Sequence, residues 1–227
     1  MSVRSPARMK SAVFIDLDGT LVKGETQLGL LMHLLREGLV PRVQAARLIS
    51  RYALYAWGCT RDAEKIRREG YAMFAGAHVA PLQAAAAAYA QARAFPKLRR
   101  GALEFIRQQD RQGRSCVLVT AATELLATPL ARSLGIPTVI ATRLNTHDGR
   151  FTGTVVTPAP YGAGKRELVA RHCEDHGIDP RLSHACTDHE SDLPLLEFVG
   201  NPSVVSPTRR LARIARARGW PVKNLDH

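Results

Sequence analysis

Residues 12–20 read Ala-Val-Phe-Ile-Asp-Leu-Asp-Gly-Thr, and this stretch decides the fold. The apolar residues predict a short buried strand over residues 12–17, and the Asp18-Gly19 dipeptide predicts a turn directly after it. In an open α/β sheet, ligands bind at the carboxyl ends of the strands. The strand therefore delivers Asp16 and Asp18 to the edge of the sheet at which a site is expected.

The rest of the chain after residue 96 alternates helices and strands, which predicts a Rossmann-like, doubly wound and mostly parallel sheet in an α/β fold. Two short runs around Asp148-Gly149 predict a small β-hairpin, because Asp-Gly is a strong turn dipeptide. The expected strands are residues 115–119, 137–141, 183–187 and 203–206, and the expected helices are residues 99–112, 124–134, 164–176 and 192–199.

Residues 26–95 contain no convincing strand and show helical periodicity instead. Gly38, Pro41, Gly58 and Pro81 divide the region into about four helices, the last of which is an Ala-rich helix that reaches residue 94. We therefore expect an all-helical cap domain over residues 24–95. It is inserted into a core domain that consists of residues 1–23 and 96–227.

The chain carries a formal net charge of +12, with 32 Lys and Arg residues and 20 Asp and Glu residues. A surplus of this size suggests nucleic acid or an acidic lipid surface as a partner. The most basic segment has Arg209, Arg210 and Arg213 interleaved with Leu211 and Ile214. We interpret it as a surface helix that packs its apolar side on the sheet, because no nucleic-acid motif or aromatic stacking platform accompanies it. No nucleic-acid partner is expected.

The four cysteines are widely spaced and form no Cys-x-x-Cys pair; they are Cys59, Cys116, Cys173 and Cys186. Secreted disulfide scaffolds are shorter and richer in cysteine, so we predict four reduced thiols and a cytoplasmic location. The N-terminus is a poor signal peptide, and no window approaches the roughly 18–20 apolar residues that span a bilayer. We expect no membrane segment, and a frayed tail of about ten residues at the N-terminus.

Polar side chains follow several of the expected strands and open one of the helices. They are Asp16 and Asp18 after the first strand, Thr120 after the second, Asp188 and Asp192 after the fourth, and Lys165 at the start of a helix. Crowded carboxylates repel one another unless a cation lies among them, and oxygen ligands at low count suit Mg²⁺ beside a phosphate. Lys165 and Thr120 would complete a phosphate cradle next to the metal.

The two aspartates of the first turn are able to divide the chemistry of phosphate ester hydrolysis. Asp16 would attack phosphorus as the nucleophile, and Asp18 would protonate the departing oxygen and then activate water against the aspartyl-phosphate. An isolated Asp-x-Asp is often only a solvated turn. The ordered succession of Asp-Leu-Asp-Gly-Thr, a Thr, a Lys and Asp-x-x-x-Asp favours the catalytic interpretation.

These motifs resemble the haloacid dehalogenase-like (HAD) superfamily, and within it the phosphoserine-phosphatase-like subgroup with a helical cap after the first strand. The resemblance implies that Asp16 is the nucleophile and Asp18 the general acid/base. It further implies that Asp16, the Asp18 carbonyl and Asp188 hold Mg²⁺ with support from Asp192, while Thr120 and Lys165 bind the phosphoryl group. The presence of Asp18 favours phosphate ester hydrolysis, because the dehalogenases of the superfamily lack this residue.

Glu25 lies nine residues after Asp16, where phosphoserine phosphatases carry a glutamate that contacts the substrate. The resemblance thus makes amino-bearing monoesters such as phosphoserine or histidinol phosphate candidate substrates. A helix N-terminal acid is the alternative interpretation of Glu25. Arg61, Arg67 and Arg68 are alternative partners for a substrate carboxylate. The sequence departs from the subgroup at Thr120-Ala121-Ala122 and at residues 187–192, which weakens the case for phosphoserine itself.

We therefore predict a Mg²⁺-dependent phosphohydrolase that cleaves a small phosphate monoester through an aspartyl-phosphate, and that is a monomer or a homodimer. One alternative is a phosphotransferase that passes the phosphoryl group to an acceptor alcohol. Another is a basic protein that binds nucleic acid or lipid and has a vestigial catalytic site.

Overall fold

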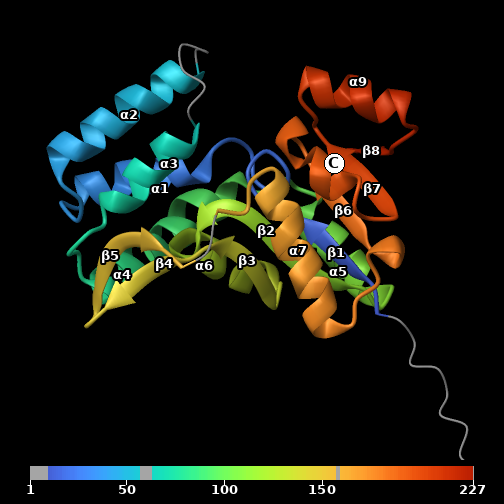
Figure 1. Cartoon of the computed structure of the whole chain (residues 1–227), viewed down its shortest axis with the longest axis horizontal. Coiled ribbons are helices and arrows are strands. Elements are labelled where there is room, and N and C mark those ends of the chain that lie inside the picture. The colour runs from blue at the N-terminus through green and yellow to red at the C-terminus, as the bar shows by residue number, and fades with distance from the viewer. Residues whose placement is uncertain (1–9, 57–62, 157–158, 227) are drawn as a thin grey trace, which may run out of the picture.

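The computed structural model describes residues 10–56, 63–156 and 159–226, and it is built around one six-stranded parallel sheet (Figure 1). The strand order is β3-β2-β1-β6-β7-β8, and every neighbouring pair is parallel. The strands are β1 (Ala12–Ile15), β2 (Ser115–Thr123), β3 (Thr138–Thr142), β6 (His184–Thr187), β7 (Asn201–Val205) and β8 (Val222–Lys223). The predicted α/β, Rossmann-like class is confirmed.

Strand β1 is buried on both faces, which explains its uninterrupted apolar sequence. Its alternate residues belong to two different cores. Val13 and Ile15 join the core that extends to α5, α6 and the inserted helices, whereas Ala12 and Phe14 join the core beneath α7, α8 and α9. The sheet is thus covered on both sides, by α5 (Ala102–Arg111) and α6 (Glu124–Leu134) on one face, and by α7 (Ala163–His176), α8 (Leu193–Leu196) and α9 (Arg209–Ala217) on the other.

In the described part of the chain, four α-helices lie between β1 and α5: α1 (Thr26–Arg36), α2 (Arg42–Ala56), α3 (Ala63–Ala72) and α4 (Val79–Tyr89). Figure 1 shows α1, α2 and α3 as a group beside one end of the sheet. The predicted Ala-rich helix changes its pitch at its end, because α4 continues as a π-helix over Ala90–Ala94. The antiparallel hairpin of β4 (Leu144–His147) and β5 (Arg150–Val155) packs against α3, where Gly153 lies close to Ala72.

The chain crosses twice between the sheet and these helices, and the two crossings pair with each other. Val22 and Leu98 form an antiparallel bridge. The Lys23 N–H donates to the Lys97 carbonyl at 2.9 Å, and the Arg99 N–H donates to the Leu21 carbonyl at 2.9 Å. The helical insertion is therefore joined to the sheet by two hydrogen-bonded segments that lie side by side.

Some predicted elements differ in detail from the structure, and one strand is present that the sequence did not predict. Strand β2 extends to Thr123, past a register shift between Val119 and Thr123. The helix expected over residues 192–199 is a 3-10 turn over Glu190–Asp192 followed by the single-turn α8. Strand β8 was not predicted, because two exposed residues give no periodic signal.

The basic C-terminal segment forms α9 and packs its apolar side on the sheet, as predicted, although the buried residues are Leu211 and Ala215 and the expected Ile214 is only half-buried. Cys116, Cys173 and Cys186 are free thiols, as expected. No helix of the described part of the chain is long and apolar enough to cross a membrane. The expected frayed tail, Cys59 and Arg61 fall outside the described residues.

Candidate active site

The turn after β1 is shaped by its contact with Asp188, at the end of the neighbouring strand β6. Gly19 has a φ of 76°, and a Cβ atom there would lie 2.0 Å from Asp188 Oδ2, so only glycine fits. The Thr20 hydroxyl is 3.3 Å from Asp16 Oδ2 and 3.4 Å from Asp188 Oδ1. The backbone of this turn therefore sets the separation of the two acids.

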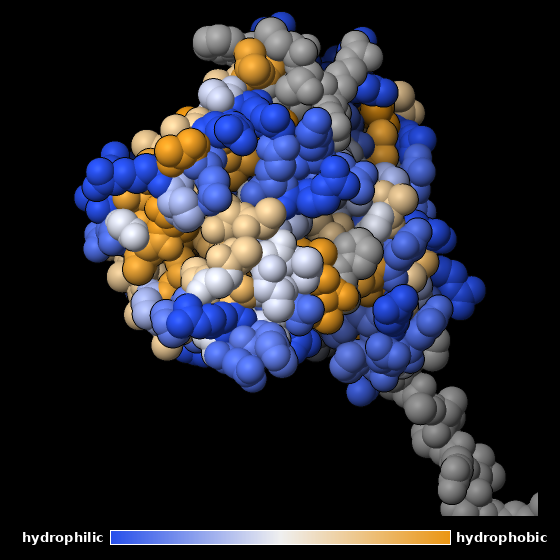
Figure 2. Space-filling view, turned by 60° about the vertical axis from the view of Figure 1, so that its left-hand side comes forward, coloured by the Kyte–Doolittle hydropathy of each residue, from blue (hydrophilic) through white to orange (hydrophobic). Residues whose placement is uncertain are grey.

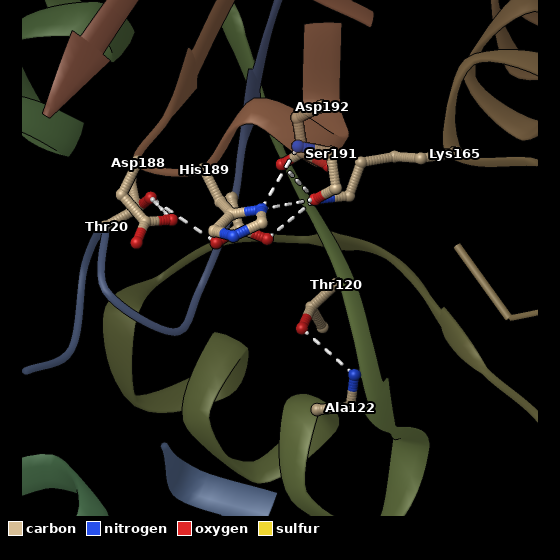
Figure 3. Close-up of polar contacts among 9 residues, drawn as sticks. Thr20, Thr120, Ala122, Lys165, Asp188, His189, Ser191 and Asp192 are labelled. Atoms are coloured by element: carbon tan, nitrogen blue, oxygen red, sulfur yellow. Dashed lines mark hydrogen bonds and ion pairs between the residues drawn. The ribbon is translucent and has the colours of Figure 1, made fainter. Parts of the chain in front are cut away.

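Lys165 joins two of the predicted carboxylates from below the rim of the sheet. It lies in the first turn of α7, and its Nζ donates to Asp16 Oδ1 and to Asp192 Oδ2, each at 2.7 Å. Figure 3 shows the Lys165 and Asp192 side chains converging beside Ser191. Burial by itself lowers the pKa of Lys165, but the attraction of Asp16 and then Asp192 outweighs it and raises the pKa above its ordinary value. The lysine is a fixed positive charge.

The negative charge of Asp16, Asp188 and Asp192 nevertheless exceeds the positive charge that Lys165 supplies. Burial, opposed by Lys165 and reinforced by Asp192, raises the pKa of Asp16 to about 6. Burial, followed by the charges of Asp16 and Asp192, raises the pKa of Asp188 to about 7. One buried lysine does not neutralise three neighbouring acids, so the pocket is electrostatically suited to a further cation.

Asp18 faces the inserted helices rather than Lys165. Its Oδ1 accepts a hydrogen bond of 2.9 Å from the N–H of Thr26, the first residue of α1. Burial raises the pKa of Asp18 to about 7, with a smaller contribution from the charge of Glu25 and against the hydrogen bond from the Thr26 N–H. A carboxyl group with this pKa gains and loses a proton readily near neutral pH.

Thr120 lies where β2 is distorted, and its hydroxyl accepts a hydrogen bond of 3.1 Å from the N–H of Ala122 (Figure 3). It is 2% exposed, yet it lines the same pocket as Asp16, Lys165 and Asp188. The structure thus gathers all the predicted core residues around one pocket, although they come from four separate segments of the chain.

The pocket has a volume of about 290 Å³, and its walls differ in character. The strand ends, with the turns and α7 that follow them, supply Lys165, Thr120 and all the acids except Glu25. The inserted segment supplies mainly apolar side chains: Leu28, Leu31, Leu48, Ile66, Met73 and Phe74. Figure 2, with the left-hand side of Figure 1 turned forward, shows apolar residues reaching the surface between hydrophilic ones. The pocket is therefore charged where it meets the sheet and largely apolar where it meets the helices.

Glu25 lines this pocket and precedes α1 as its N-cap residue. Its side chain makes no capping hydrogen bond, and instead its Oε2 lies 3.4 Å from the Tyr52 hydroxyl on α2. Of the three candidate arginines, Arg67 lines the pocket and stacks over the Tyr161 ring at 4.3 Å. Arg68 is exposed and is absent from the pocket wall, and Arg61 lies outside the described residues.

Several pocket residues gave no recognisable signal in the sequence. Gln27 joins α1 to the sheet, because its Oε1 accepts hydrogen bonds from the Thr123 N–H at 3.0 Å and from the Thr123 hydroxyl at 3.2 Å. Tyr52 and Tyr161 line the pocket from α2 and from the segment before α7. Gln27 could have been suspected from its place two residues after Glu25, but the tyrosines depend on the folded arrangement.

Among the described residues, no three histidine, cysteine or acidic side chains form a complete metal cage. Mg²⁺ does not require one, because it is usually bound by one or two carboxylates together with waters and substrate phosphate. Asp16 and Asp188 both approach the Thr20 hydroxyl, and each has a pKa raised by burial and by neighbouring acids. These two carboxylates fit such an ion.

Comparisons with known proteins give the family. The model for "haloacid dehalogenase-like hydrolase" matches residues 13–197. A probable phosphatase of Mycobacterium tuberculosis is 33% identical over 219 residues, which cover 95% of this chain and 75% of that protein. A histidinol-phosphatase of Neisseria meningitidis is 26% identical over 239 residues, which cover 95% and 99% of the two chains. The chain belongs to the HAD hydrolase family.

Solved structures share the fold of this chain. The crystal structure of a protein with unknown function from Bordetella pertussis matches with a TM-score of 0.85 and 28% identity, covering 96% of this chain and 99% of that one. A phosphoserine phosphatase structure with a phospho-aspartyl intermediate analogue matches with a TM-score of 0.66 and 18% identity, covering 97% and 95%. The second match concerns the fold alone. The predicted family and the prediction of an enzyme of that family are confirmed.

Proposed function

We propose that the chain is a Mg²⁺-dependent phosphohydrolase that cleaves a small phosphate monoester through an aspartyl-phosphate. The observation that carries this function is the environment of the two aspartates of the β1 turn. Asp16 is held by Lys165 at 2.7 Å, and Asp18 is held by the Thr26 N–H at 2.9 Å. Asp16 thus has a fixed cation beside it and a pKa of about 6, whereas Asp18 has no such partner among the described residues and a pKa of about 7.

Asp16, Asp188 and the Asp18 carbonyl would hold Mg²⁺, and Asp192 would support the site through Lys165. When bound, the ion supplies positive charge that offsets the charge of the phosphoryl oxygens. Lys165 binds and orients the phosphoryl group from the sheet side, and Thr120 does so with its hydroxyl. This assignment follows the chemistry of the donors, because all of these residues line one pocket.

The chemical step divides between the two aspartates. A carboxylate oxygen of Asp16 forms a bond to phosphorus, and the bond from phosphorus to the ester oxygen breaks. Protonated Asp18 gives its proton to that departing oxygen and becomes a carboxylate. Asp18 then takes a proton from water, whose oxygen attacks phosphorus and releases phosphate and Asp16. The pKa of about 7 suits Asp18 to both roles.

Residues 24–95 would act as a cap that closes the pocket and selects the leaving group, while residues 1–23 and 96–227 form the catalytic core. Glu25 offers a carboxylate to a substrate ammonium group, and the apolar side chains of the cap accommodate the carbon skeleton. The family relatives include a histidinol-phosphatase of Neisseria meningitidis and a phosphoserine phosphatase of Mycobacterium tuberculosis. These observations support an amino-bearing phosphate monoester as the substrate.

The direct test is hydrolysis of p-nitrophenyl phosphate by the purified chain with Mg²⁺ and then with EDTA. We expect turnover with Mg²⁺, its loss with EDTA, and its recovery when Mg²⁺ is restored. Asp16→Asn should remove turnover, whereas Asp110→Asn, an exposed change on α5, should not. Activity that persists in Asp16→Asn contradicts the nucleophile assignment. Transfer to an added alcohol in preference to water would identify a phosphotransferase instead.

A further inference from the structure

Arg99 is a buried arginine that lies outside the cluster of acids and points at the β1 turn. Its side chain is 9% exposed. Its Nε donates to the Thr20 carbonyl at 3.0 Å, and its Nη2 donates to the Gly19 carbonyl at 2.7 Å. Its Nη1 donates to Asp226 Oδ2 at 2.6 Å. The whole guanidinium is therefore committed to the turn and to one carboxylate near the end of the chain.

The two carbonyls that Arg99 holds belong to the residues that set the spacing of the acids. Gly19 packs against Asp188 so closely that no Cβ atom fits. The Thr20 hydroxyl contacts both Asp16 and Asp188. A small rotation of the Gly19 or Thr20 peptide would therefore move the atoms that separate these acids.

Asp226 is itself held in place from two sides. Leu225 is 6% exposed, and its carbonyl accepts a hydrogen bond of 2.8 Å from the Gly101 N–H. Asp226 Oδ1 lies 2.8 Å from Lys23 Nζ, in a pair whose lysine is 58% exposed. Within the described residues, Asp226 is the one carboxylate that pairs with Arg99. Without it, Arg99 would remain a buried charge with no counter-charge, which is a costly arrangement.

Arg99 itself lies at one of the two chain crossings between the sheet and the helical insertion, and the β1 turn leads into the other. The Leu21 carbonyl accepts the Arg99 N–H at 2.9 Å, and Lys23 lies two residues further along the same paired segment. Asp226 thus contacts Arg99, Arg99 binds the carbonyls of Gly19 and Thr20, and the Thr20 hydroxyl contacts Asp16. Only a guanidinium has the planar fork of donors that reaches all three acceptors, because a lysine presents a single point charge.

We propose that Arg99 is a positioning residue of the reaction, holding the turn that carries the two catalytic aspartates, and that Asp226 keeps Arg99 oriented for that task; this rests on the proposed phosphohydrolase function. Misplacing reacting groups by about 1 Å costs on the order of a hundredfold in rate. We expect the loss of rate to appear in kcat and not in KM, because neither Arg99 nor Asp226 lines the substrate pocket.

The experiment compares Arg99→Lys, Asp226→Ala and Asp226→Asn in the full chain, with p-nitrophenyl phosphate and Mg²⁺. We expect kcat to fall by about 10- to 100-fold in Arg99→Lys and Asp226→Ala, with KM changed by less than about threefold. Asp226→Asn retains an acceptor oxygen at the same place, so it should recover part of the kcat lost in Asp226→Ala.

Two control variants separate positioning from stability. Asp179→Ala removes another hydrogen-bonded aspartate, which accepts from the Arg181 N–H at 2.9 Å and lies next to Lys10, beyond the opposite end of β1. It should lower the melting temperature and leave kcat unchanged. Arg111→Lys alters an exposed ion pair on α5 and should change neither. All rates are measured well below the melting temperature of the least stable variant.

Equal kcat in wild type, Arg99→Lys and Asp226→Ala, with only the melting temperature lowered as in Asp179→Ala, would overturn the positioning role. If Arg99→Lys does not fold, the two Asp226 variants carry the test. A wild-type chain without any phosphatase activity contradicts the proposed function instead. In that case, amide hydrogen exchange over residues 16–24 tests whether Arg99 and Asp226 hold the β1 turn. Faster exchange in Asp226→Ala than in Asp179→Ala supports this positioning role, and equal exchange in the two variants excludes it.

Discussion

The two walls of the pocket are built in opposite ways. On the sheet side, Lys165 and Asp192 are buried, Asp16 is 11% exposed, and Lys165 bonds to each of the two acids at 2.7 Å. On the helical side, Glu25 is exposed, and its Oε2 lies 3.4 Å from the Tyr52 hydroxyl. Charges that are packed and paired keep a fixed geometry, whereas an exposed carboxylate on a helix end is free to meet a ligand. We infer that the sheet wall performs the chemistry and the helical wall selects the substrate.

The largest expected effect comes from removing the cation of the sheet wall. Lys165→Met leaves Asp16 and Asp192 buried without their partner, which costs about 3–5 kcal/mol of unfolding free energy. It should also lower kcat by about 100- to 1000-fold, as the loss of a charge-stabilising donor does in other enzymes. Urea unfolding and steady-state kinetics measure the two effects.

The matched control is Arg111→Met, which breaks an ion pair whose two members are each 63% exposed. Such a pair contributes at most about 1 kcal/mol, so stability and kcat should stay near the wild-type values. Wild-type turnover in Lys165→Met would show that the sheet wall is structural and not catalytic, and would refute the division of roles between the two walls.

Gly19→Ala tests whether the sheet wall tolerates any displacement. The new Cβ would lie 2.0 Å from Asp188 Oδ2 at a φ of 76°, so we expect kcat to fall by at least about tenfold. Gly113→Ala is the control, because Gly113 has a φ of 72° and nothing within 4 Å of the added Cβ. Backbone strain should lower the free energy of unfolding of both variants by about 1 kcal/mol or more, but only Gly19→Ala should lose activity. Similar kcat values for the two would mean that the contact with Asp188 is unimportant.

Glu25→Ala sharpens the comparison from the helical side. For amino-bearing phosphate monoesters, kcat/KM should fall by about tenfold, as expected for the loss of one charge-assisted contact. For p-nitrophenyl phosphate, which has no ammonium group, it should change by less than about twofold. Glu37→Ala, at the other end of α1, serves as the control. An unchanged ranking of amino and non-amino substrates in Glu25→Ala would refute the proposed role of Glu25.

The smallest effect is expected at the contact between the two walls. Arg67 on α3 stacks over Tyr161 at 4.3 Å, and a cation–π pair of this kind contributes about 0.5–1 kcal/mol. Arg67→Met should therefore raise KM by about two- to fivefold with kcat nearly constant. Arg68→Met, one residue further along the same helix and away from the pocket, should leave KM unchanged. Equal KM values in the two variants would assign no role to the stacking.

Much of the sheet wall could be predicted from the sequence because its residues are tied to strand ends. The apolar run of β1 ends at Asp16, strand β6 ends just before Asp188, and parallel strands place their carboxyl ends at one edge. The bounds of α6 were predicted to the residue, since Gly135 stops the helix in a left-handed conformation. Strand β8 and the π-helix at Ala90–Ala94 could not be predicted, because packing rather than periodicity determines them.

The sequence by itself determined the α/β class, the order of the elements and the identity of the residues around Asp16. Short stretches of consecutive residues show both the apolar periodicity of the elements and the polar side chains that follow the strands. Only the tertiary structure decided which distant residues meet. In the folded chain Arg67 lines the pocket and Arg68 does not. Tyr52 lies beside Glu25. Arg99 lies between the β1 turn and Asp226. Such contacts join residues as many as 127 positions apart, and no local pattern encodes a separation of that length.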